Sequence, residues 1–427
     1  MPLFGRAKTD DAATPAPDPT PVNQPGPPVD APRDVDDYRD HLLSQVTSLR
    51  PFGIGLLEAC GLTLCESITA DIDLPVFTAA TVYGWAVRAS NLVGARPGHP
   101  VVLPLVGEVG ADGTPGAPLS LGTTMRVLAG APVPEGADAV VPVIDGEIVS
   151  DGVQFESEAA FHQGLWVAGS RVAEGDPLLS SGTVLDARMI AMLAELGLDK
   201  VLARPRPRVI VGTVGANLID AGRPLAKLTQ TYDAVTPMIA AAAEQEGAQT
   251  FAIGVLPQEP SALSRALSDQ LVRADLFLLA APLTDELTRA LETLGTFETA
   301  RVAMTPGDEV VFGLVGPDHV PLLVLPPNAV DAYVVYEVFG RSLVHALAGT
   351  DPLERAVVPL RVNKPLPVDH VRTQFVLGTK TSRRVTPLDM DAQAGGVELA
   401  RANVIAQIRP GVAVSVGDEV SCWPLGE

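Results

Sequence analysis

Three kinds of hydrophobic pattern follow one another along the first half of the chain. Apolar residues recur at helical spacing over 36–49, and Asp34 is placed to cap that helix. A second helix is expected over 55–65, followed by an extended segment over 68–74. Between 75 and 164, short apolar runs are separated by Gly- and Pro-rich turns, which predicts a small β domain.

Strands and helices alternate at short intervals between residues 204 and 350. Such alternation is typical of a parallel α/β sheet with helices on both faces. The expected strands span 208–212, 251–256, 276–281 and 322–325, and the expected helices span 232–246, 260–273, 285–294 and 332–347. A further helix is expected over 187–196, before this region.

After residue 351 the pattern returns to short strands, which indicates a compact C-terminal β domain. The fold class is therefore α/β plus β in several domains, because 427 residues exceed one ordinary domain. The expected divisions are a Pro-rich tail (1–33), a helical and extended domain (34–75 with 164–203), a β insertion (76–163), an α/β module (204–350) and a β domain (351–427).

The chain carries 51 acidic and 30 basic residues, a formal net charge of −21. A surface of this sign repels phosphates and anionic lipid headgroups, so no nucleic acid partner is expected. The three cysteines, Cys60, Cys65 and Cys422, form no disulfide framework or zinc set, which favours a reducing cytoplasm. The longest apolar run, 276–283, is too short for a membrane span, and the N-terminus lacks the apolar core of a signal peptide.

Residues 1–33 are rich in Pro, Asp, Thr and Ala, a composition that cannot repay the entropy of ordering. We expect a disordered tail with extended, polyproline-like conformers. Two interpretations of the tail stay open. It is either a plain tail or a docking segment whose apolar anchor is Met1–Arg6.

Five sequence motifs resemble those of the molybdenum-insertase family, which includes MoeA and gephyrin. They occur in the family's order, and the longest resembles the family's "RIMTGAPVPEGADAVV" almost letter for letter. The motifs are Leu74–Phe77 with Gly84–Arg88, Arg126–Val141, Tyr232–Asp233, Val302–Gly307 and Leu325–Asn328. The resemblance implies an elongated homodimer with a molybdopterin-binding-like α/β module and a C-terminal β barrel. In that dimer the α/β module of one chain lies near the β insertion of the other.

The resemblance also implies an activity, the insertion of molybdate into molybdopterin after hydrolysis of an adenylylated intermediate. That chemistry needs carboxylates for Mg²⁺, and cationic side chains and backbone amides for phosphate and molybdate. Many of the corresponding positions carry other residue types here. The replaced positions are Thr78, Tyr83, Ala129, Trp166, Arg171, Ala216, Asn217, Thr305 and Asp308. The family's Gly-rich loop is also shortened, to 280–285, and contains no glycine.

Acids are replaced by neutral or basic residues, and bases by neutral or acidic ones. We therefore expect no metal site and no catalytic residues, and we expect the molybdenumtransferase activity to be lost. Asp145, Asp233 and Asp285 are the nearest acids that could compensate, but each suits a turn or a surface position.

The main hypothesis is a non-catalytic, homodimeric scaffold without a cofactor. Gephyrin, in the same family, binds a peptide of a membrane receptor in a groove and links it to the cytoskeleton. The matching positions are Tyr38, His370, Arg372, Arg409 and Pro410. Aromatic and Pro-lined grooves suit short apolar peptides. The expected partner is a peptide segment of a membrane or cytoskeletal protein, such as a cell-division protein, which would recruit the cytoplasmic chain to the membrane.

Two alternatives stay open. The first is a working molybdenumtransferase with an altered site, and only in this case are Mg²⁺ and molybdopterin the expected ligands. The second is a regulatory subunit that pairs with an active paralogue. Binding of adenylylated molybdopterin would favour the first, and exchange of chains with a paralogue would favour the second.

Overall fold

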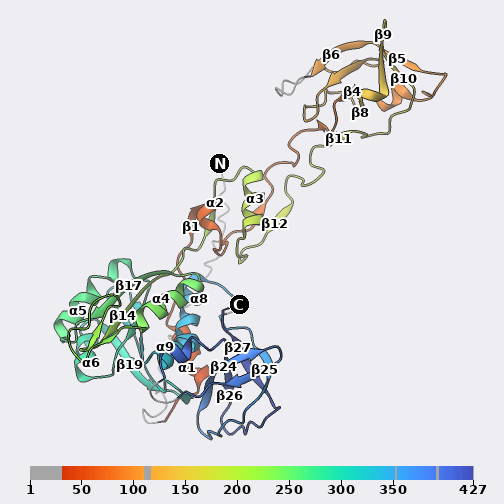
Figure 1. Cartoon of the computed structure of the whole chain (residues 1–427). Helices are drawn as coiled ribbons and strands as arrows, with labels where there is room; N and C mark the ends of the chain where they lie inside the picture. The colour runs from red at the N-terminus through yellow and green to blue at the C-terminus, as the bar shows by residue number, and fades with distance from the viewer. Residues whose placement is uncertain (1–30, 110–116, 352, 391–393, 427) are drawn as a thin grey trace, which may run out of the picture.

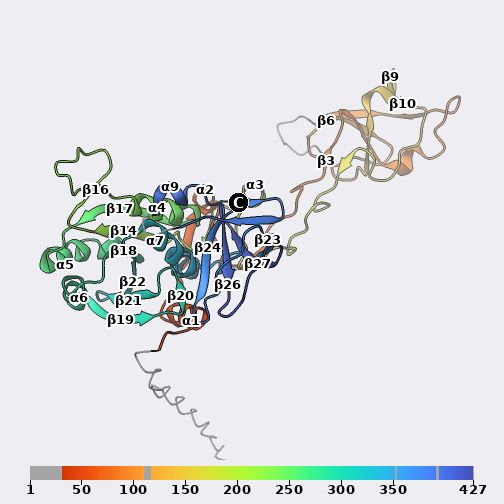
Figure 2. The same ribbon diagram turned by 60° about the horizontal axis from the view of Figure 1, so that its bottom comes forward.

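The computed structural model describes residues 31–109, 117–351, 353–390 and 394–426. The chain is elongated, with the β insertion at one end and a small middle part that carries α2 (Leu56–Ala59) and α3 (Ala187–Glu195) (Figure 1). The α/β module and the C-terminal β domain lie side by side at the other end (Figures 1 and 2). Of the tail expected over 1–33, only 31–33 lie within the described residues. None of the helices described is long and apolar enough to cross a membrane.

The first helix, α1 (Val35–Ser44), packs into the core of the α/β module. Asp34 caps it as expected, because its side chain accepts hydrogen bonds from the amides two and three residues further on. Tyr38 and Leu42 on one face of the helix are buried in this core. The helix ends at Ser44, earlier than the helical spacing predicts.

The middle part is built from segments on either side of the insertion. The antiparallel pairs are β1 (Phe52–Gly55) with β13 (Lys200–Ala203), and β2 (Ile68–Thr69) with β12 (Pro177–Leu179). The helix expected over 55–65 is wrong in length, because α2 ends at Ala59. Gly61 follows with a φ of 81°, a left-handed conformation that cannot continue a helix.

The insertion consists of a four-stranded sheet in the order β6-β7-β4-β8 and a three-stranded sheet in the order β5-β10-β9. Its strands are β4 (Gly84–Val87), β5 (Val101–Leu103), β6 (Leu105–Val109), β7 (Thr124–Val127), β8 (Ala139–Pro142), β9 (Gly146–Val149) and β10 (Gly152–Phe155). Gly84 allows β4 and β8 to approach, since a Cβ there would lie 2.1 Å from the carbonyl oxygen of Val141. Strands β3 (Ala79–Ala80) and β11 (Leu165–Trp166) pair where the insertion joins the middle part.

The α/β module has a six-stranded sheet in the order β17-β14-β18-β22-β21-β19. Its strands are β14 (Arg208–Val214), β17 (Gln249–Leu256), β18 (Leu276–Ala280), β19 (Gly295–Arg301), β21 (Glu309–Val315) and β22 (Val320–Leu325). Strands β17, β14, β18 and β22 are parallel, whereas β21 and β19 are antiparallel to their neighbours. The turn 316–319 between β21 and β22 is too short for the crossover that a parallel pair needs.

Helices cover both faces of this sheet. They are α4 (Val235–Gln245), α5 (Pro260–Ser268), α6 (Asp285–Glu292), α7 (Ala329–Val335) and α8 (Arg341–Ala348), with the π turn Tyr336–Gly340 between α7 and α8. Alternate residues of β14 face opposite sides. Val209 and Val211 pack in the core that holds α1, α4, α7 and α8, and Ile210 packs in the core that holds α5 and α6.

The C-terminal β domain contains a closed barrel of five strands, because the pairing of β24 with β26 completes the ring β24-β25-β23-β27-β26. Its strands are β23 (Val358–Val362), β24 (Thr373–Thr381), β25 (Arg384–Pro387), β26 (Val404–Ile408) and β27 (Glu419–Pro424), with a short helix α9 (Gly396–Leu399). Strand β20 (Met304–Thr305), from the α/β module, pairs with β24 and so connects the module to the barrel.

Candidate active site

The carboxyl ends of β14 and β18 mark the place where a ligand is expected. The chain leaves β14 toward β17 on one side, and after β17 it returns to β18 on the other side. Connections that diverge in this way leave a crevice at the carboxyl ends of the strands, where open α/β sheets bind ligands. The segments 215–234, 281–284 and 326–328 follow the strands at this edge, and 305–308 precedes β21 there.

A cavity of about 350 Å³ lies at this edge, lined by residues that follow β18 and β22 and by 307–309. Its charged side chains are Asp308, Glu309 and Asp331, and its lining contains no Lys or Arg. Burial, and then the neighbouring charge of Asp308, raises the pKa of Asp331. This part of the crevice is therefore electronegative and does not by itself suit an anion.

The polar residues that end the two short segments 281–284 and 326–328 each cap a helix. The side chain of Thr284 accepts a hydrogen bond from the amide of Leu287 at 3.3 Å, so Asp285 is the first residue of α6. Asn328 caps α7 in the same way, since its side chain accepts from the amide of Val330 at 2.8 Å. These side chains are committed to local structure, and Asp285 stands in an ordinary acidic first turn.

Asp233 also has a structural role. Its buried carboxylate accepts hydrogen bonds from the Thr213 hydroxyl at 3.1 Å and from the amides of Val235 and Thr236 at 2.9 and 3.1 Å. It thereby ties the end of β14 to the start of α4. Asp145, the third acid considered from the sequence, lies in the insertion, so the three do not form one site.

Four of the replaced motif positions lie at the insertion end of the chain. Thr78 accepts a hydrogen bond at Oγ1 from the amide of Ala168 at 3.1 Å and so holds two neighbouring segments together. Tyr83, Ala129 and Trp166 are exposed on strands and turns near this joint. The result is a partly aromatic surface in place of charged groups.

Arg171, a basic residue where the family has an acid, has a carboxylate partner in the same chain. Its guanidinium donates to both carboxylate oxygens of Glu195, at the end of α3, at 2.8 and 3.2 Å. The sequence pattern does not indicate this partner, because Glu195 is 24 residues away and belongs to no motif. The pair joins the turn that contains Arg171 to α3.

Eight of the nine replaced positions fall into two groups at opposite ends of the chain, and the ninth, Arg171, lies beside α3 in the middle part. The crevice group is Ala216, Asn217, Thr305 and Asp308, and the insertion group is Thr78, Tyr83, Ala129 and Trp166. In Figure 1, β11 lies far from β14, and in Figure 2, β3 lies far from both β14 and β20. A single chain therefore does not bring the two groups into one site.

Residues 33–197 match the family model described as the MoeA N-terminal region (domain I and II). The chain is 30% identical to molybdopterin molybdenumtransferase 1 of Mycobacterium tuberculosis over 353 residues. The aligned region spans 78% of this chain and 83% of that protein. The chain belongs to the MoeA family. Molybdopterin molybdenumtransferase 2 of the same species is 29% identical over 418 residues, or 92% of this chain and 100% of that one.

The solved structure of a MoeA protein from Pyrococcus horikosii, described as a molybdopterin biosynthesis protein, shares this fold. It superposes with a TM-score of 0.81 over 93% of this chain and 100% of that chain. At 23% identity, this likeness concerns the fold alone. It agrees with the multi-domain MoeA architecture expected from the sequence.

The MoeA relatives correct two expectations from the sequence. The hypothesis of a non-catalytic scaffold is wrong, because relatives that share most of the chain's length are named as transferases. The expected loss of enzymatic activity is contradicted by the same relatives. The replacement of the family's charged side chains, taken motif by motif, is therefore not evidence that the reaction is lost.

The residues expected in a peptide groove lie near the junction of α1 and the barrel. Tyr38 is fully buried and packs edge-on against Phe339, with ring centroids 5.6 Å apart, so its ring is not available to a peptide. Arg409 forms an ion pair with Asp36 of α1 at 2.9 Å. The exposed positions are His370, Arg372, Arg409 and Pro410.

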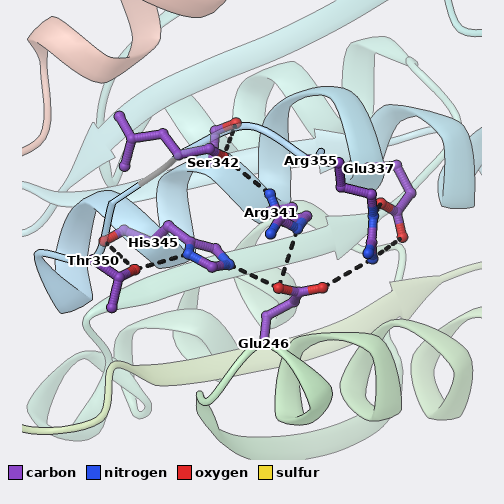
Figure 3. A network of polar contacts seen from close by, with 8 residues as sticks. Glu246, Glu337, Arg341, Ser342, His345, Thr350 and Arg355 are labelled. Carbon is purple, nitrogen blue, oxygen red and sulfur yellow. Dashed lines mark hydrogen bonds and ion pairs between the residues drawn. The ribbon is translucent and has the colours of Figure 1, made fainter. Parts of the chain in front are cut away.

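A buried ionic network joins α4 and α8 to the segment that leads into the barrel (Figure 3). Glu246, just after α4, contacts Arg341 at 3.1 Å, His345 at 2.7 Å and Arg355 at 2.9 Å. Arg355 also binds Glu337 of the π turn at 2.6 Å. The sequence pattern does not indicate this network, since Glu246 and Arg355 are 109 positions apart and no motif connects them.

Proposed function

We propose that the chain is a molybdopterin molybdenumtransferase that transfers molybdenum from molybdate to adenylylated molybdopterin in the cytoplasm, with an altered site. The observation that carries this proposal is the 30% identity between the chain and molybdopterin molybdenumtransferase 1 of Mycobacterium tuberculosis, over 83% of that protein's length. The crevice at the carboxyl ends of β14 and β18 is the place for the ligand, on the general grounds that apply to open α/β sheets.

The active form is a homodimer in this proposal. Support comes from the separation of the two groups of motif positions, which lie at opposite ends of one chain (Figures 1 and 2). Two chains in an antiparallel arrangement would place the insertion of one over the crevice of the other. A two-fold axis would then create two equal sites.

The residues present do not fit a Mg²⁺ site of the family's kind. The two family acids of the first motif are Thr78 and Tyr83 here, and neither a hydroxyl nor a phenol replaces a carboxylate as a ligand. Within the residues described, no group of three or more His, Cys, Asp or Glu side chains could hold a metal ion. We therefore derive no step of the reaction through a bound metal.

Two measurements test the proposed function. Expression of the chain should restore molybdenum-enzyme activity in a strain that lacks its molybdenumtransferase. The purified full-length protein should bind adenylylated molybdopterin in an equilibrium assay. If the chain neither restores activity nor binds that compound, the proposal is wrong.

A further inference from the structure

This inference rests on the proposed function and concerns how the crevice holds an anionic substrate. The segments that follow the four parallel strands are 215–234, 257–259, 281–284 and 326–328. Together they contain two basic residues, Arg223 and Lys227, both in the first segment. The charged residues that line the cavity at the same edge of the sheet are all acidic, so this segment is the source of positive charge among the four.

The loop 215–230 has a defined conformation. Its base is a parallel pair of two short strands, β15 (Leu218–Ile219) and β16 (Thr231–Tyr232). The side chain of Gln230 accepts hydrogen bonds from the amides of Ala226 and Lys227 at 2.8 and 3.0 Å. The Tyr232 hydroxyl donates to the carbonyl of Arg223 at 3.0 Å. The backbone of both basic residues is thus held by side chains of β16 and its neighbour.

A second contact ties the loop to the end of β17. Asp220 accepts a hydrogen bond from the amide of Val255 at 3.2 Å. Gly254 makes room for this carboxylate, because a Cβ there would lie 2.6 Å from Asp220 Oδ1 and the glycine has a φ of 71°. Figure 2 shows the loop projecting beyond the sheet next to β16.

The two charges are accessible. Lys227 is exposed, and its ammonium group forms no ion pair or hydrogen bond within the described part of the chain. Arg223 has a long contact of 3.5 Å with Asp220, and its side chain is 74% exposed. In a chain of net charge −21, two exposed bases on one ordered loop at a ligand crevice, one unpaired within the described residues and one in a long ion pair, suggest a specific anionic contact.

We propose that Arg223 and Lys227 bind the phosphate groups of a nucleotide-bearing pterin, and so supply positive charge to the crevice, which Thr305 and Asp308 on its other side do not. A guanidinium binds phosphate oxygens in pairs, and an ammonium adds a compact charge beside it. Neighbouring strands are about 4.8 Å apart, so β14 and β21 are separated by roughly 15 Å. A ligand with a ring system and phosphates spans such a distance.

The test compares two doubly substituted proteins of equal charge. Arg223→Gln with Lys227→Gln should weaken the binding of adenylylated molybdopterin by about ten- to a hundred-fold at low salt, the usual effect of losing charge-assisted hydrogen bonds. The difference from wild type should shrink as salt screens the contact. Lys200→Gln with Arg383→Gln, two exposed bases outside the crevice loops, should bind like wild type.

Each outcome decides a separate point. If wild type does not bind the adenylylated compound, the proposed function fails. If wild type binds it and the loop variant binds equally well, the assignment of Arg223 and Lys227 is wrong while the function stands. If the control pair weakens binding as much as the loop pair, the effect is one of net charge, and the assignment is also overturned. Circular dichroism and melting temperature show that both variants are folded.

Discussion

At the scale of single residues, Glu246 shows how a buried charge is maintained in this fold. Burial alone would raise the pKa of its carboxyl group. The hydrogen bond from His345 and the charges of Arg341 and Arg355 outweigh that effect and lower the pKa to about 2. Breaking such a buried cluster is costly, because Arg341 would stay buried without a carboxylate partner and Arg355 would keep only Glu337.

Glu246→Gln should therefore lower the free energy of unfolding by about 3–5 kcal/mol, since Arg341 and Arg355 would lose their shared carboxylate. Urea unfolding at neutral pH measures the change. Glu292→Gln is the matched control, because Glu292 is exposed on α6 and should change stability by less than about 0.5 kcal/mol. Equal stability of the two variants would show that the network contributes nothing.

The same carboxylate predicts a pH dependence. The pKa of Glu246 is about 2 in the folded protein, below its ordinary value of 4.5. Its contribution to stability is therefore complete above the unfolded pKa and is lost as the pH falls from 4.5 toward 2. Across this range, wild type should lose more stability than Glu246→Gln. Parallel curves of unfolding free energy against pH for the two proteins would contradict the assignment.

Residues with a local role could be predicted from the sequence, and residues with distant partners could not. The capping role of Asp34 depends on its own helix and was predicted. The pairing of Arg171 with Glu195 depends on the tertiary fold. The same is true of Tyr38, which a resemblance placed at a groove but which the core of the α/β module covers.

At the scale of elements, the strands and helices of the α/β module were predicted well because their apolar runs are long. Strand β14 is a nearly continuous run of apolar, buried residues, as expected for a central strand of a parallel sheet. The antiparallel strands β19 and β21 were missed. Strand β19 is half exposed, and β21, although buried and apolar, follows β19 without the intervening helix that strict alternation predicts. The helix expected over 55–65 is shorter because Gly61 has a left-handed φ and Leu64 forms a β-bridge with Ala203 of β13.

The loop 215–230 gives a prediction at this scale. Gly254→Ala should displace Asp220 and release the loop from β17, because the added Cβ would lie 2.6 Å from the carboxylate and the backbone φ of 71° strains alanine. Trypsin should then cleave after Lys227 several times faster than in wild type. Gly55→Ala is the control, since a Cβ at Gly55 meets nothing within 4 Å. An unchanged cleavage rate in Gly254→Ala would mean that this anchor does not hold the loop.

At the scale of the whole molecule, the sequence predicted the family and the order of the parts. The prediction of a non-catalytic scaffold was wrong. The motif positions were located from the resemblance, residue by residue. The elongated shape was also implied by the resemblance alone, and in it the crevice group and the insertion group lie far apart in one chain (Figures 1 and 2). Local patterns carry no information on such a separation, because it is set by how the insertion, the middle part and the α/β module are joined.

The separation leads to a test with mixed chains. Trp166→Ala alters the insertion end, and Asn217→Trp fills the exposed rim of the crevice, so each homodimer should be inactive. In a mixed dimer, one of the two sites receives an intact crevice from the first variant and an intact insertion from the second. Random reassociation of equal amounts should therefore restore about a quarter of wild-type activity in molybdenum transfer. Two copies of the same variant, unfolded and reassociated in the same way, are the control and should stay inactive. If the mixture gains no activity although mass measurements show mixed dimers, each site belongs to a single chain and the dimeric site is wrong.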